Sequence, residues 1–166
     1  MLILGLDPGV ATIGFGVIDG RTLSSISLVT CGCIRTRPGI PMGSRLVEIR
    51  RDLRELIERH RPHAAAMETL FFNKNVRTAL IVAQTRGVLL MTLAEAGLPI
   101  AEYGPQSIKM AVVGYGKGVK SQVQAMVARI LHLSTPPKPD DAADALAVAL
   151  CHRFTLGPTS VATQKK

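Results

Sequence analysis

Four carboxylates in this sequence stand at the ends of apolar runs or among alanines, where a charged side chain is costly. Asp7 ends the run LILGL near the N-terminus, and Glu68 ends the run AAAM in the same way. Asp141 and Asp144 are three residues apart in an alanine-rich stretch, so on a helix they project from one face about one turn apart. Such acids must be hydrated, hydrogen-bonded or bound to a cation.

If these acids are brought together, they form a cluster that suits a hard divalent cation. About four negative charges repel one another unless they are protonated or neutralised. Oxygen ligands without thiolates or imidazoles select Mg²⁺, or Mn²⁺ in its place. Two such ions, roughly 3.5 to 4 Å apart, can activate a water and stabilise the leaving 3′ oxygen of a phosphodiester. The residues therefore predict a metal-dependent nuclease with two ions in each active site.

Each acid also has a purely structural explanation. Asp7 can cap the turn that follows it, Glu68 can cap a helix or turn, and the helix macrodipole stabilises acids near a helix start. The neighbouring Asp140 is interpreted as the cap of the last helix.

An Asp-x-Gly turn between two strands, as at Asp7, is used in two ways. Ribonuclease H-like nucleases hold a metal there, whereas actin, Hsp70 and sugar-kinase ATPases bring its glycines close to a nucleotide phosphate.

Length and charge favour the nuclease over the ATPase. The chain of 166 residues fits one domain, expected over residues 1–157, followed by a polar and disordered tail over 158–166. The ATPases use two such domains around a nucleotide cleft. Twenty Lys and Arg against 12 Asp and Glu give a formal charge of +8, as expected of a protein that binds a polyanion. No apolar run reaches the roughly 18 residues of a membrane span, so we expect a cytoplasmic protein.

The hydrophobic pattern predicts the elements that must position the acids. Apolar runs predict strands over 2–6, 13–18, 25–35, 64–67 and 98–103, the first three antiparallel. Helical spacing predicts helices over 44–60 with Ser44 as cap, 75–96, 106–113, 121–133 and from 140 onward. Ligands gather at the carboxyl ends of strands in an open α/β sheet, so neighbouring first and fourth strands would bring Asp7 and Glu68 together. The predicted fold is α/β, a mixed five-stranded sheet flanked by helices.

Other polar residues are interpreted as structural. The acids of the helix over 44–60 alternate with arginines and are expected to form solvated ion pairs. Glu95 and Glu102 are set aside as surface residues. Cys31 and Cys33 are expected on one face of the third strand, opposite Ile26, as reduced thiols that fill apolar space. A metal site there would need two further ligands, which the nearby sequence does not offer.

Three segments, in this order, resemble the RuvC family of Holliday-junction resolvases, which have the ribonuclease H-like fold. They are LGLDPG with a following G-x-G-V, METLFFNKN, and PDDAADALAVA, and the resemblance extends to about residue 152. It implies that Asp7, Glu68, Asp141 and Asp144 bind the metal of a Mg²⁺-dependent endonuclease. It also implies a homodimer that resolves four-way DNA junctions by paired symmetric nicks, in recombination and repair, with the RuvA and RuvB branch-migration complex as partner.

The resemblance also places residues on the DNA. Phe71 falls where the family has an aromatic residue near unpaired junction bases, and stacking there is worth ~1 to 3 kcal/mol per base. Lys109 and Lys120 align with basic residues near the scissile phosphate, where they can offset charge in the transition state. Three further residues are candidates for nonspecific phosphate contacts, with solvated surface an equally good explanation: Lys74, Arg77 and Lys117.

Subunit pairing and two other functions remain open at this point. The helix over 75–96 is apolar on more than one face, which makes it the candidate dimer interface. A non-catalytic junction-binding module, or a ribonuclease H-like enzyme acting on RNA, would keep the fold. The complete acid set favours the nuclease, because a protein that only binds DNA has no need of four carboxylates beside a polyanion. An ATPase is disfavoured because this sequence has no second phosphate motif. The glycine-rich turn over 114–118 does not match a Walker loop.

Overall fold

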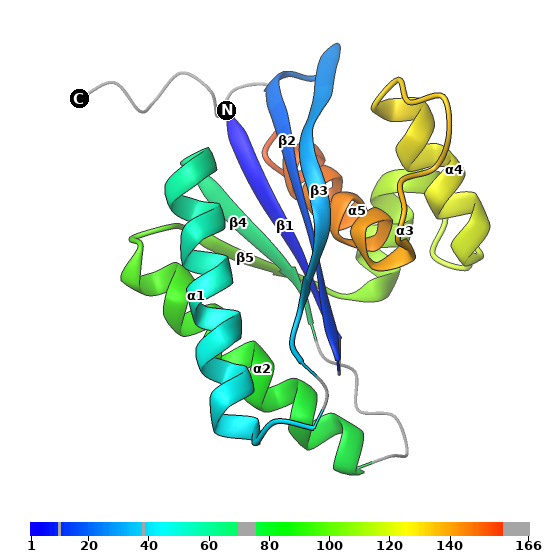
Figure 1. The fold of residues 1–166 in the computed structure, drawn as a ribbon. Coiled ribbons are helices and arrows are strands. Elements are labelled where there is room, and N and C mark those ends of the chain that lie inside the picture. The colour runs from blue at the N-terminus through cyan, green and yellow to red at the C-terminus, as the bar shows by residue number, and fades with distance from the viewer. Residues whose placement is uncertain (10, 38, 70–75, 158–166) are drawn as a thin grey trace.

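The structure of the chain is a computed structural model that describes residues 1–9, 11–37, 39–69 and 76–157. Within these ranges, five strands form one mixed sheet in the order β3-β2-β1-β4-β5 (Figure 1). The strands are β1 (Leu2–Pro8), β2 (Thr12–Thr22), β3 (Ser25–Arg35), β4 (Ala64–Glu68) and β5 (Ile100–Tyr103). The first three are antiparallel, and β4 and β5 run parallel to β1. The predicted sheet is therefore confirmed.

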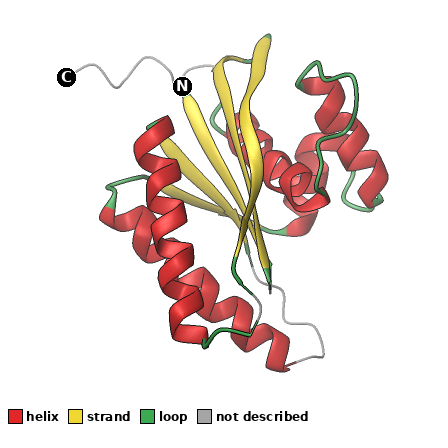
Figure 2. Ribbon diagram, viewed as in Figure 1, coloured by secondary structure: helices red, strands yellow, loops and turns green. Residues whose placement is uncertain are grey.

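Helices cover both faces of this sheet (Figure 2). They are α1 (Met42–His60), α2 (Val76–Glu95), α3 (Pro105–Val113), α4 (Lys120–Ile130) and α5 (Asp140–Thr155). Helices α1 and α2 share one apolar core with the sheet, and α5 shares the other with α3 and α4. No helix in the described part of the chain is long and apolar enough to cross a membrane.

Glycines let α5 lie very close to the sheet. A Cβ atom at Gly5 of β1 would stand 2.1 Å from the carbonyl oxygen of Ala145, and one at Gly14 of β2 would stand 1.9 Å from that of Asp141. Gly16, which pairs with Gly5 across the two strands, faces the same helix. Because no side chain separates the backbones, the first turn of α5 sits directly against the ends of β1 and β2.

The start of α1 differs from the prediction. Ser44 lies inside the helix, which begins at Met42 with Pro41 as its N-cap residue. The amide of Arg45 donates to the carbonyl oxygen of Pro41 at 3.1 Å, so helical hydrogen bonding begins before Ser44. Pro41 already has a φ of −56°, and its ring holds that angle without help from a side-chain cap.

A bulge in β3 overturns the predicted face of Cys31. Leu28 and Thr30 pair with consecutive residues of β2, so Val29 is an extra residue in β3. The alternation of faces shifts at that point. Cys31 therefore packs with Ile26 and Leu28 against the α5 core rather than opposite them.

Candidate active site

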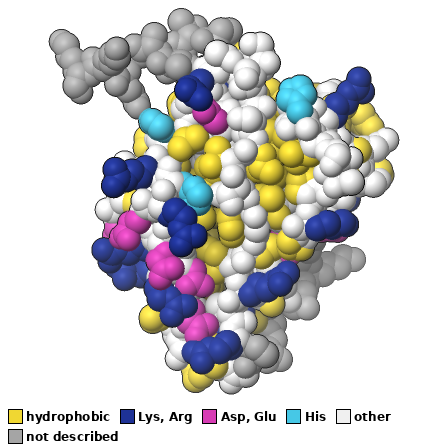
Figure 3. All heavy atoms as spheres, turned by 45° about the horizontal axis from the view of Figure 1, so that its top comes forward, with side chains coloured by type: hydrophobic (Ala, Val, Ile, Leu, Met, Phe, Trp, Pro, Cys, Tyr) yellow, Lys and Arg dark blue, Asp and Glu magenta, His cyan; other side chains and the backbone are white. Residues whose placement is uncertain are grey.

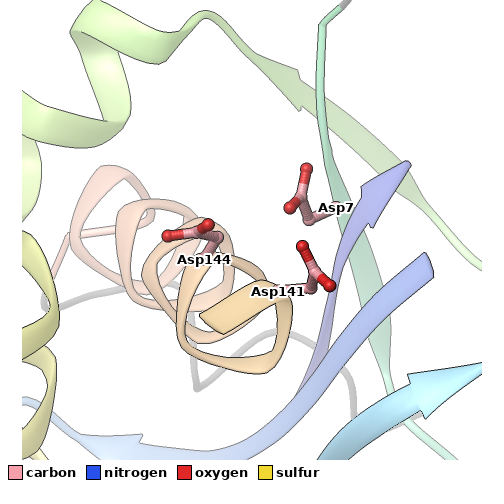
Figure 4. Close-up of side chains that lie close together, drawn as sticks. All are labelled: Asp7, Asp141 and Asp144. Atoms are coloured by element: carbon pink, nitrogen blue, oxygen red, sulfur yellow. The ribbon is translucent and has the colours of Figure 1, made fainter. Parts of the chain in front are cut away.

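Three of the predicted acids meet at the ends of β1 and α5. Asp7, Asp141 and Asp144 each place a carboxylate oxygen within 4.8 Å of the others, and all three are half-buried (Figure 4). Asp7 lies opposite Gly14 in the β1–β2 ladder, so the close approach of α5 at Gly14 also brings the two helix acids to Asp7. Opposite oxygen ligands of one Mg²⁺ are about 4.2 Å apart. The spacing therefore fits a shared divalent cation.

Glu68 joins this cluster from the neighbouring strand. β4 lies beside β1 in parallel, so the ends of the two strands coincide. A side-chain hydrogen bond joins the carboxyl groups of Asp7 and Glu68. Glu68 also lines a cavity of about 250 Å³ together with Asp144, Lys109 and Lys120. Glu68 is thus linked to the three aspartates through Asp7, and it shares a cavity with Asp144.

Burial and mutual repulsion make this cluster bind protons. Burial is the main cause that raises the pKa of Asp7 to about 7 from an ordinary value of 3.8, and the neighbouring carboxylates add to it. Burial also raises the pKa of Glu68, and the charge of Asp144 adds to that rise. The same repulsion is relieved when a cation takes the place of the protons. A divalent cation would therefore compete with protons for this cluster near neutral pH.

Two lysines lie at the edge of the acid cluster. The Nζ atom of Lys120, in the first turn of α4, is 2.8 Å from a carboxylate oxygen of Asp144. This hydrogen bond raises the pKa of Lys120. Lys109 of α3 lines the cavity with Glu68. Both lysines predicted near the reacting phosphate therefore face the acids, whereas Lys117 is exposed in the turn between α3 and α4.

Asp140 is not the cap of α5. The helix begins at Asp140 with Pro139 as the N-cap residue, and no side chain in the described chain caps this end. The Asp140 carboxylate instead accepts a hydrogen bond from Lys138 at 3.1 Å and lies 3.7 Å from the Nζ atom of Lys120. The hydrogen bond from Lys138 lowers the pKa of Asp140. The Asp140 carboxylate thus faces two ammonium groups instead of the free backbone N–H groups at the start of α5.

The basic residues beside the cluster have no acids among them. From residue 104 to 139, which spans α3 and α4, the sequence has five Lys and Arg and no Asp or Glu: Lys109, Lys117, Lys120, Arg129 and Lys138. We call this stretch the basic layer. It lies on the same face of the sheet as α5 (Figure 1). A polyanion that approached the acid cluster from this side would meet positive charge first.

The arginines of α1 are balanced by acids instead. Ion pairs join Arg51 to Asp52 at 2.8 Å and Arg54 to Glu58 at 2.8 Å within this helix. Arg50 pairs with Glu95 of α2 at 2.9 Å. Blue and magenta side chains adjoin along the left of the face seen in Figure 3. The predicted ion pairs of this helix are confirmed, so α1 contributes little net positive charge.

Three predicted DNA contacts lie beyond what the structure describes. Phe71 and Lys74 fall outside the described residues, and Arg77 lies in the first turn of α2 with its side chain not described. Their roles stay predictions.

The comparison with known proteins assigns the family. The sequence profile of the family described as crossover junction endodeoxyribonuclease RuvC matches residues 3–152. The chain belongs to the RuvC family. The RuvC of Pelotomaculum thermopropionicum is 53% identical over 152 residues, which cover 92% of this chain and 92% of that protein. The resemblance predicted from three motifs is confirmed.

Solved RuvC structures share the fold. The Thermus thermophilus RuvC in complex with a Holliday junction substrate matches with a TM-score of 0.88 and 36% identity, over 93% of this chain and 94% of that one. A second structure of Thermus thermophilus RuvC matches with a TM-score of 0.85, at the same identity and coverage. The mixed sheet with its flanking helices is therefore the ribonuclease H-like fold of the RuvC family.

Two residues that the sequence did not single out contact the backbone of the acids. Gly14 admits the first turn of α5, and Arg86 of α2 donates to the carbonyl oxygen of Glu68 at 2.6 Å. Glycines on two paired strands opposite an alanine-rich helix are a signal of close packing that could have identified Gly14. Arg86 has no such signal, because an arginine within a helix is most often a surface residue.

Proposed function

We propose that this protein is a homodimeric endonuclease that resolves four-way DNA junctions by paired symmetric nicks, through metal-dependent phosphodiester hydrolysis. The observation that carries the proposal is the convergence of four acids from β1, β4 and α5 beside the acid-free basic layer. The family assignment supports the same reaction. DNA recombination and repair are the processes that require it.

Mg²⁺ is the proposed cofactor, with Mn²⁺ as a substitute and two ions in each active site. The donors are all carboxylate oxygens, which suits these hard ions. Asp7, Asp141 and Asp144 would hold one ion, and Glu68 would complete the ligand set with Asp7. When bound, the ions supply an activated water and neutralise charge at the leaving 3′ oxygen.

Lys120 is the proposed catalytic cation of the chain itself. Its ammonium group now pairs with Asp144. A divalent cation held by Asp144 would weaken this pair and leave Lys120 able to contact a phosphate oxygen at the cavity. There it offsets the negative charge that develops in the transition state. Lys109, which lines the same cavity, is proposed to hold the substrate phosphate.

The basic layer is the proposed track for the DNA backbone. Each phosphate that a lysine or arginine neutralises adds about 0.9 to the dependence of log K on log salt concentration. Lys117, exposed in this layer, is proposed as one such contact. Lys74 and Arg77 are proposed as others, and Phe71 is proposed to stack on an unpaired base of the junction.

The outer face of α2 is the proposed dimer interface. Leu80 is 61% exposed and Met91 is 45% exposed, and their spacing puts both on the face that also holds Gln84 and Gly87. Every exposed residue of α2 from Leu80 to Ala94 is uncharged. An uncharged face with a glycine at its centre suits close packing against a second copy. A two-fold dimer then offers two identical active sites to a junction with two-fold symmetry.

Two further parts of the proposal concern the setting of the reaction. We place the protein in the cytoplasm, because its substrate is DNA. The RuvA and RuvB branch-migration complex is the proposed partner, on family grounds alone.

The reaction is tested with a synthetic four-way junction, a linear duplex of the same sequence and an RNA–DNA hybrid. Each is end-labelled and incubated with Mg²⁺, Ca²⁺ or a chelator, and the products are resolved on a denaturing gel. We expect paired nicks at symmetric positions in two strands of like polarity, in the junction alone and in Mg²⁺ alone. Equal cutting of the linear duplex would refute junction selectivity. Preferential cutting of the hybrid would assign the protein to RNA, and binding without cutting would leave a binding module.

A further inference from the structure

Arg86 of α2 reaches the end of the strand that carries Glu68. Its Nη1 atom donates to the Glu68 carbonyl oxygen at 2.6 Å, and its Nη2 atom donates to a carboxylate oxygen of Glu102 in β5. The Arg86 side chain is only 12% exposed. One guanidinium therefore joins α2, β4 and β5 directly behind the acid cluster. A planar fork of donors makes such a bridge, whereas a single ammonium group does not.

The β1–β4 ladder explains why Glu68 needs this donor. Alternate residues of a central parallel strand bond to opposite neighbours. The amides of Ala65 and Thr69 donate toward β5, so the carbonyl group of Glu68 turns toward β1. The next residue of β1 in that direction is Pro8, which has no N–H to donate. The ladder thus leaves this carbonyl oxygen without a backbone donor, and Arg86 provides one.

We propose that Arg86 is a positioning residue that aims the Glu68 carboxylate into the acid cluster. By holding the peptide that follows Glu68, the guanidinium fixes the backbone from which the Glu68 side chain projects. Glu102 holds the guanidinium in place from the other side. The inference rests on the proposed role of Glu68 as a metal ligand. It predicts that Arg86, which is not itself in the acid cluster, controls how well the cluster binds metal.

The test compares Arg86→Met, Arg86→Lys and Glu102→Gln with the wild-type chain. Metal binding is measured by calorimetric titration of each free protein with Mn²⁺, and the Mg²⁺ concentration for half-maximal cleavage is measured on a saturating four-way junction. Supporting groups behind metal ligands typically contribute about 10- to 100-fold to metal affinity. We expect a loss of this size in Arg86→Met and a smaller one in Arg86→Lys. We expect the smallest loss in Glu102→Gln, where the bond to Glu68 remains.

Two controls separate this role from plain stability. Arg54→Met removes an exposed ion pair on α1, and we expect no change in its metal requirement. Thermal unfolding shows which variants are folded; if Arg86→Met is not, Arg86→Lys and Glu102→Gln carry the test. A folded Arg86 variant with wild-type metal affinity and a wild-type Mg²⁺ requirement would overturn the proposal, even if its melting temperature fell.

Glu68→Gln in the same titration distinguishes the proposed role of Arg86 from the proposed role of Glu68 as a metal ligand. If Glu68→Gln weakens metal binding and the folded Arg86 variants do not, only the role of Arg86 is wrong. If Glu68→Gln itself binds metal as the wild type does, the proposed ligand set is wrong, and the role of Arg86 is wrong with it.

Discussion

Gly14→Ala should separate the acids without removing any of them. A Cβ at this position would stand 1.9 Å from the Asp141 carbonyl oxygen, whereas ordinary contacts begin at 3.4 Å. The neighbouring atom belongs to the backbone of a packed helix, so it cannot rotate away. The first turn of α5 must therefore retreat by about 1.5 Å, which is the kind of shift that overpacking forces on a core, at a cost of ~1 to 3 kcal/mol in stability.

This retreat would carry Asp141 and Asp144 away from Asp7. Their oxygens now lie within 4.8 Å of one another, and a cation bound at about 2.1 Å cannot follow ligands that move apart by a large fraction of that length. A misplacement of about 1 Å can cost roughly 100-fold in rate. We therefore expect single-turnover cleavage of a four-way junction in Mg²⁺ to fall by about that factor.

Junction binding in chelator should stay unchanged in Gly14→Ala, because the substitution removes no basic residue. Gly43→Ala is the matched control, since a Cβ there meets no described atom within 4 Å. It should cut at the wild-type rate. A folded Gly14→Ala protein that cuts as fast as the wild type would show that the close approach of α5 does not set the active site.

Three further predictions follow from the acid cluster and from α2. Asp7→Asn should keep junction binding in chelator and lose at least about 100-fold in cleavage rate, because it removes a metal ligand but no basic contact; wild-type nicking by this variant would refute the proposed ligand set. Because the pKa of Asp7 is raised to about 7 in the folded chain, its protonated form stabilises the metal-free fold below pH 4, and that stability is lost as the pH rises through 7. Between pH 5 and 8, the melting temperature of the metal-free wild type should therefore fall more than that of metal-free Asp7→Asn. At pH 8, Mg²⁺ should raise the melting temperature of the wild type more than that of the variant. Parallel curves of melting temperature against pH for the two proteins would contradict this. Met91→Asp should give a monomer of 17.8 kDa in light scattering, because a charge buried in an interface is costly. Val47→Asp, on the 69% exposed side chain of α1, should leave the dimer intact, and a dimeric Met91→Asp would exclude this face of α2.

The sequence predicts the parts of the site that depend on strand order and helix periodicity. Asp7 and Glu68 end two apolar runs, and parallel neighbours bring such ends together at one edge of the sheet. Asp141 and Asp144 are three residues apart, so any helix puts them on one face. These regularities are local in the sequence. To predict the site, only one further assumption was needed, namely that the strands ending at Asp7 and Glu68 are adjacent.

The sequence does not predict details that depend on which groups compete for the same partner. Asp140 has the residue type of a helix cap, but Lys138 takes its carboxylate. The bulge at Val29, which reverses the face of Cys31, is set by pairing with β2 rather than by the residues of β3. Arg86 has a role because Pro8 cannot donate to Glu68, and that vacancy is visible only once the register of β1 and β4 is known.

The separation of charge in the fold explains why binding and cutting should respond differently to metal. The basic layer over residues 104–139 has five cations and no acid. Two of the five, Lys120 and Lys138, pair with acids of α5, so the other three can contact phosphates without any ion. The acid cluster next to it repels a phosphate until its own charge is neutralised. Protons can neutralise Asp7 near pH 7, but a protonated carboxyl group no longer offers the charge that holds a divalent cation. By the proposed mechanism, only metal binding would both admit the scissile phosphate and prepare the reaction. This would confine cleavage to the metal-loaded protein and leave DNA binding independent of the metal.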